Sequence, residues 1–123
     1  MLYDGDCRLC RWAARVVDRL DRHEQVALLS LGDEEASRLL ASVPRAEHDQ
    51  RWWLVRRDGT VVPGDGGGGI ELLTELRLTR TLGRALQALR ATRLVGGLNR
   101  RVSHSRSRVG RFVPDGPAPR RYP

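Results

Sequence analysis

The chain of 123 residues contains no lysine, only two cysteines, one phenylalanine and one methionine. All 22 of its basic residues are therefore arginines, which excludes every mechanism that needs a lysine amine. No apolar run approaches the roughly 20 residues of a membrane-spanning helix. The start of the sequence also lacks a basic segment followed by an apolar one, so we expect no secretory signal and a reducing, cytoplasmic setting.

The net charge of +7 is confined to the last quarter of the chain. Residues 1–92 carry 14 arginines and 14 acidic residues, whereas residues 93–123 carry 8 arginines and 1 acidic residue. This change predicts a neutral domain over residues 1–92 and a basic extension over residues 93–123. Helical spacing of apolar residues predicts that the extension is helical at first. Its Ser/Arg-rich and Pro-rich end predicts disorder.

The apolar pattern of residues 1–92 predicts alternating strands and helices. Short apolar runs indicate strands, and apolar residues three or four apart indicate helices. The expected strands are 2–3, 26–31, 52–56 and 60–62, and the last two are joined by a hairpin turn at Asp58-Gly59. The expected helices are 7–22, 33–43 and 70–89, of which the last is either continuous or divided in two. The order β-α-β-α-β-β-α is that of a thioredoxin-like α/β fold with a mixed central sheet.

The two cysteines, Cys7 and Cys10, form a Cys-x-x-Cys pair at the expected start of the first helix. A helix N-terminus presents unpaired N–H groups and the positive end of the helix dipole, and both favour an anion. A thiolate at Cys7 would be stabilised there, and the thiolate is the reactive form of cysteine. Cys10 is expected one helical turn deeper, within reach to close a disulfide with Cys7. In a reducing compartment such a pair is more often catalytic or metal-binding than structural.

Acidic residues precede the cysteine pair. Asp4, at the end of the first strand, has two interpretations: a carboxylate that exchanges a proton with Cys10, or a residue that shapes the turn. Asp6 is expected to be the N-cap of the first helix. A strand that ends in Asp-x-Asp also presents the nucleophile of haloacid-dehalogenase-type phosphatases. Those enzymes need a lysine, and the chain has none.

The stretch Asp4-Gly5-Asp6-Cys7-Arg8-Leu9-Cys10 resembles the signature of the DCC family of predicted thiol-disulfide oxidoreductases, an Asp-x-x-Cys-x-x-Cys motif after the first strand. The likeness covers roughly residues 1–90. It implies a thioredoxin-like fold and dithiol chemistry, with Asp4, Cys7 and Cys10 in the motif positions. Thioredoxins also place a cis-proline before the third strand. Here that position falls near Gln50-Arg51, where there is no proline.

Metal and phosphate chemistry find less support in the sequence. A zinc site needs four ligands, and only His23, His48 and His104 could join the cysteines, without paired spacing. The glycine-rich segment 63–69 lacks the Gly-Lys-Ser/Thr of a P-loop and is expected to be a flexible loop before a helix. We therefore expect no metal and no bound cofactor.

The predicted function is thiol–disulfide exchange with a protein or small-molecule thiol or disulfide substrate. In this hypothesis Cys7 attacks, Cys10 resolves the mixed disulfide, and Asp4 shuttles a proton. The alternative is a non-enzymatic thioredoxin-like binding module. In that case the arginine-rich tail, residues 93–123, would engage an anionic partner such as nucleic acid or a membrane surface.

Overall fold

The computed structural model of the chain describes residues 1–122, apart from the side chains at positions 66, 92 and 103. Within these residues, four strands form one sheet: β1 (Leu2–Tyr3), β2 (Leu29–Ser30), β3 (Trp53–Val55) and β4 (Val61–Pro63). They lie in the order β2-β1-β3-β4. β1 pairs parallel with β2, whereas β3 pairs antiparallel with both β1 and β4. The sheet is therefore mixed, as the sequence predicted.

The helices follow the predicted order and then continue into the C-terminal part of the chain. They are α1 (Arg8–Leu20), α2 (Glu34–Leu39), α3 (Gly69–Glu75), α4 (Arg80–Ala88), α5 (Thr92–His104) and α6 (Arg106–Val109). The expected helix over residues 70–89 is thus divided into α3 and α4. The order β-α-β-α-β-β-α is confirmed from β1 to α3 and is consistent with a thioredoxin-like fold. None of the helices described in residues 1–122 is long and apolar enough to cross a membrane.

Two segments outside the expected strands and helices form helical turns. Residues Arg45–Gln50 make a 3₁₀ helix, and Gly64–Gly68 make a π-helical turn that leads directly into α3. The expectation of a flexible loop at the glycines was wrong because the glycines lie against fixed neighbours. A Cβ at Gly64 would collide with the indole ring of Trp52. Gly67 has φ 110°, a backbone conformation that favours glycine.

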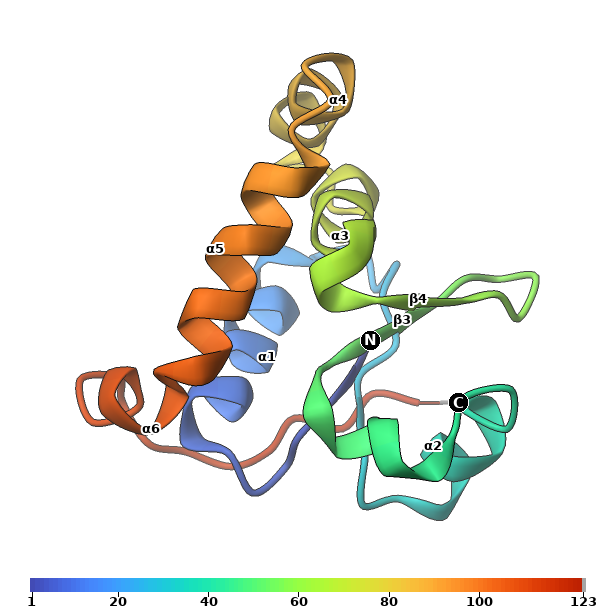
Figure 1. The fold of residues 1–123 in the computed structure, drawn as a ribbon, viewed down its shortest axis with the longest axis vertical. Coiled ribbons are helices and arrows are strands. Elements are labelled where there is room, and N and C mark those ends of the chain that lie inside the picture. The colour runs from blue at the N-terminus through green and yellow to red at the C-terminus, as the bar shows by residue number, and fades with distance from the viewer. Residues whose placement is uncertain (123) are drawn as a thin grey trace.

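The core lies on both faces of the sheet. Successive strand residues point to opposite faces, so Tyr3 and Leu2 enter different clusters. One cluster joins the sheet to α1 and α3, and the other joins it to α2 (Figure 1). Trp53 is 4% exposed and belongs to the α2 cluster, while Trp52 packs against the other cluster. Packing of helices on both faces of the sheet fixes the start of α1 relative to the end of β1.

The C-terminal part of the chain packs back onto the domain. α5 lies beside α3, and α6 contacts both α5 and α1 (Figure 1). The following residues run past the start of α1 to β2, where Arg121 makes an antiparallel bridge with Leu28. The hydroxyl of Tyr3 donates a hydrogen bond to the Pro119 carbonyl. Composition predicted a disordered end, but composition carries no information about such contacts between the end of the chain and its first half.

Candidate active site

The loop between β1 and α1 is shaped by Asp4. Its Oδ1 accepts hydrogen bonds from the backbone N–H groups of Asp6, at 2.9 Å, and Cys7, at 3.3 Å. Such bonds from an aspartate to the residues that follow it stabilise a tight turn. Gly5 lies against Ser30 at the end of β2, and a Cβ at Gly5 would collide with the Ser30 side chain. The loop is therefore held from within and from the neighbouring strand.

Cys7 is the N-cap of α1. Its backbone is extended, and its Sγ accepts a hydrogen bond from the N–H of Cys10 at 3.4 Å. The prediction that Asp6 caps this helix was wrong, because Asp4 turns the chain and the helix begins one residue later, at Arg8. A sulfur at this position faces the unpaired N–H groups of the first turn, which favour a negative charge.

Cys10 lies directly behind Cys7, and both residues are free thiols. The Cys10 thiol donates to Cys7 Sγ over a distance of 2.7 Å. Cys10 also packs against the cluster under α1. Burial, the hydrogen bond and charge of Cys7 and the charge of Asp4 together raise the pKa of the Cys10 thiol to about 12, against a lowering by Arg106. Cys10 is therefore protonated at neutral pH.

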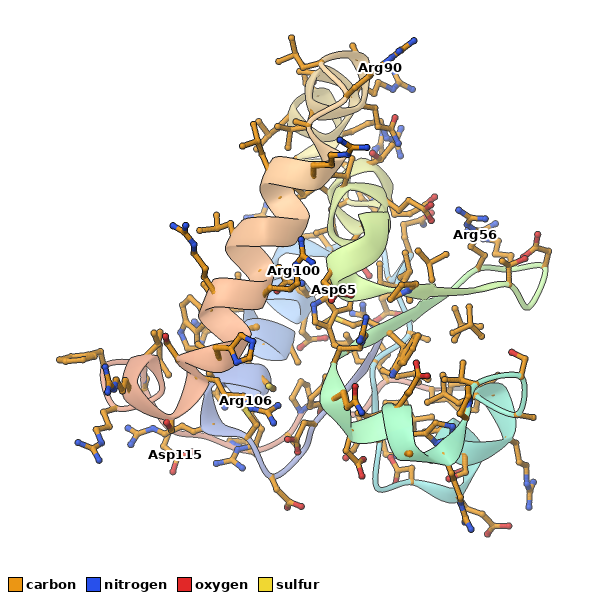
Figure 2. All side chains as sticks on the ribbon, in the orientation of Figure 1. Arg56, Asp65, Arg90, Arg100, Arg106 and Asp115 are labelled. Atoms are coloured by element: carbon orange, nitrogen blue, oxygen red, sulfur yellow. The ribbon has the colours of Figure 1, made fainter. Side chains whose placement is uncertain are left out.

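Asp4 also faces α6. Its Oδ2 lies 3.7 Å from Nη1 of Arg106, and the Asp4 side chain is 30% exposed. Figure 2 shows Arg106 next to the first turn of α1. The structure thus brings together Asp4, Cys7 and Cys10, the three candidate residues, and adds Arg106, which lies about a hundred residues further along the chain.

A pocket of about 410 Å³ opens beside Cys7. One wall comes from the β1–α1 loop and the start of α1, and the other comes from α6 and the residues after it. The lining residues are Asp4, Asp6, Cys7, Arg8, Arg106, Ser107, Gly110 and Arg111. The second wall was not predicted: the tail was recognised as arginine-rich, but no local pattern shows that its arginines approach Cys7.

The segment after α6 is held along α1 by arginines of that helix. Arg11 donates to the Gly5 carbonyl at 2.8 Å and pairs with Asp115 at 2.9 Å. Arg15 donates to the carbonyls of Pro114 and Pro117. These bonds fix the second wall of the pocket relative to the cysteine loop. In the part of the chain that the structure describes, no group of three or more His, Cys, Asp or Glu residues could hold a metal ion.

Comparison with known families matches residues 1–112 to the DCC1-like thiol-disulfide oxidoreductases. The chain belongs to this family. No curated protein and no solved structure matches the chain. The matched part of this DCC1-like chain contains the cysteine loop and every residue that lines the pocket. Membership confirms the resemblance inferred from the Asp-x-x-Cys-x-x-Cys motif. It supports a thiol-disulfide oxidoreductase function, with thiols and disulfides as substrates.

Proposed function

We propose that Cys7 and Cys10 are the redox pair through which this DCC1-like protein exchanges disulfides. The observation that supports this best is the placement of two adjacent thiols in different surroundings. Cys7 lines the pocket and caps α1, whereas Cys10 lies behind it and packs against the core. A thiol that lines a pocket, beside a second thiol that packs against the core, suits the roles of attacking and resolving cysteine.

The reaction with a disulfide substrate then has two displacements. The Cys7 thiolate attacks one substrate sulfur, a mixed disulfide forms at Cys7, and the other half of the substrate leaves as a thiolate. The Cys10 thiolate next attacks Cys7 Sγ, and the second half leaves. Two electrons pass to the substrate, and a Cys7–Cys10 disulfide remains. The reverse sequence oxidises a substrate dithiol.

The second displacement needs a base, because the pKa of Cys10 is raised to about 12. Asp4 is proposed for this role, since its charge acts on Cys10. One Asp4 oxygen is taken by two backbone N–H groups, and the other has only the 3.7 Å contact with Arg106. That second oxygen is the one proposed to exchange the proton.

Two single substitutions test the assignment. Cys7→Ser should abolish reduction of a chromogenic disulfide, because no thiolate remains in the pocket. Cys10→Ser should accumulate a mixed disulfide at Cys7, detectable as an added mass on the intact protein. Circular dichroism of both variants checks that the fold is retained. Full disulfide-reducing activity in both variants would contradict the mechanism.

The alternative of a non-enzymatic binding module with an anionic partner on the tail has less support. Three tail arginines, Arg106, Arg120 and Arg121, pair with acidic residues of the same chain. Their charges are therefore partly neutralised within the protein.

A further inference from the structure

The pocket beside Cys7 carries an excess of positive charge. Its lining holds three arginines, Arg8, Arg106 and Arg111, and two aspartates, Asp4 and Asp6. Asp4 is already engaged, because its two oxygens face two backbone N–H groups and Arg106. The balance at the mouth of the pocket is therefore set by Asp6 on one side and by Arg8 and Arg111 on the other.

Arg8 and Arg111 are free to contact a ligand. Both are exposed, and within residues 1–122 neither side chain takes part in an ion pair or a hydrogen bond. The neighbouring arginines differ in this respect, since Arg11 and Arg15 are bonded to the segment after α6. Arg8 belongs to the first turn of α1, and Arg111 follows α6, so the two arginines come from the two walls of the pocket.

We propose that this pocket selects small disulfides that carry carboxylates, of the kind formed by acidic peptide thiols. The proposal rests on the proposed redox role of Cys7. A guanidinium presents a planar fork of donors that matches a carboxylate. The volume of about 410 Å³ falls within the roughly 300–1,000 Å³ of small-molecule sites. A carboxylate bound by Arg8 and Arg111 would leave the disulfide of the same molecule beside Cys7.

The reaction needs no further reactant for one turnover. The reduced Cys7/Cys10 pair supplies two electrons, the substrate disulfide is cleaved to two carboxylated thiols, and the protein ends with its own disulfide. The proton of Cys10 passes to a base, and the two departing thiolates take up protons from solvent according to pH.

The test is single-turnover oxidation of the reduced full chain, followed by quenching, alkylation and mass spectrometry. The probes are glutathione disulfide, which is anionic, 2-hydroxyethyl disulfide, which is neutral, and cystamine, which is cationic. The double variant Arg8→Gln/Arg111→Gln should lower the ratio of the glutathione disulfide rate to the cystamine rate about tenfold relative to wild type at low salt. Comparing ratios removes any common change in the reactivity of Cys7.

The matched control is Arg84→Gln/Arg93→Gln. These two exposed arginines lie on α4 and α5 and do not line the pocket. The control removes the same net charge and should leave the rate ratio unchanged. An unchanged ratio in the pocket variant, or an equal fall in the control, overturns the proposed selectivity. If wild type is oxidised by none of the three disulfides, the proposed redox function itself is wrong.

Discussion

Asp4 makes a structural contact and an electrostatic one with the same carboxylate. Its Oδ1 holds the cysteine loop through two backbone N–H groups, and its charge contributes to the raised pKa of Cys10. The two interpretations from the sequence, turn former and proton carrier, are therefore compatible in one residue. The two interpretations predict different rates for the resolving step, the attack of Cys10 on the mixed disulfide at Cys7, once the charge of Asp4 is removed.

Asp4→Asn separates the two roles, because the amide keeps an oxygen that accepts the N–H groups but has no charge. If Asp4 accepts the proton of Cys10, resolution of the Cys7 mixed disulfide should slow about a hundredfold near neutral pH. If Asp4 acts only through its charge, its removal lowers the Cys10 pKa and resolution becomes faster. Rapid-quench mass spectrometry of the mixed disulfide measures the rate.

The pH profile of the same step gives an independent readout. The pKa of Cys10 is about 12, so the thiolate fraction rises about tenfold per pH unit from neutrality upward. Resolution in Asp4→Asn should follow that slope, whereas wild type should depend less steeply on pH near neutrality. Asp4→Ala serves as the control that also loses the turn. Equal slopes in wild type and Asp4→Asn would exclude proton transfer by Asp4.

At the scale of elements, α5 is placed by one of two consecutive glycines. A Cβ at Gly96 would collide with the carbonyl oxygen of Asp65 in the π-helical turn. A Cβ at Gly97 would meet nothing within 4 Å. Gly96 is therefore needed for close approach of α5 to the turn, and Gly97 is not.

Alanine at these two positions should change stability in opposite directions. Gly97→Ala should raise the free energy of unfolding by about 0.5–1 kcal/mol, because alanine loses less backbone entropy in a helix. Gly96→Ala should lower it by about 1–3 kcal/mol, because α5 must move away from the turn. Urea unfolding of both variants measures the difference. Similar effects at both positions would show that α5 does not pack on the turn as described.

The elements with a regular apolar pattern could be predicted from the sequence. Val17 and Leu20, three residues apart in the apolar pattern, both lie on the side of α1 that packs against the core. The glycine segment could not be predicted, because its conformation depends on the ring of Trp52 and on α5, which no local pattern encodes. The split after α3 was left open for a similar reason: Leu76 is buried but adopts an extended backbone, which ends the helix.

The candidate site likewise has one part that could be predicted from the sequence and one part that could not. The cysteine pair and Asp4 lie within seven consecutive residues, so a local motif was enough to find them. Arg106 and Arg111 could not be placed, because their approach to Cys7 depends on the path of the whole chain. The choice between Asp6 and Cys7 as N-cap depends on a turn set by Asp4 hydrogen bonds, which shifts the helix start by one residue.

At the scale of the whole molecule, Arg121 joins the end of the described chain to its first half. Its guanidinium pairs with Asp18 and with the buried Asp21, and it also donates to the Val26 carbonyl. Asp21 is 3% exposed and accepts two further hydrogen bonds from backbone N–H groups. A buried carboxylate that loses its cationic partner is costly, even where backbone donors remain.

Arg121→Gln should therefore lower the free energy of unfolding by about 2–3 kcal/mol. Arg120→Gln is the matched control, because Arg120 is half exposed and lies 3.7–3.8 Å from its partners Asp33 and Glu35. Its loss should cost less than about 1 kcal/mol. Chemical denaturation of the two variants gives the comparison. Equal losses would mean that the buried contact with Asp21 contributes no more than a surface ion pair.

Because the two walls of the pocket come from distant parts of the chain, cutting the chain between them would separate the walls. A cut at residue 92, where the charge changes, leaves Cys7 on one fragment and Arg106 on the other. The family match ends at residue 112, one position after Arg111, the last residue that lines the pocket. The family match thus ends where the second wall ends. Arg121, which holds the continuation of that wall against α1 and β2, lies beyond the matched residues, so the match does not include the contact that anchors the end of the described chain.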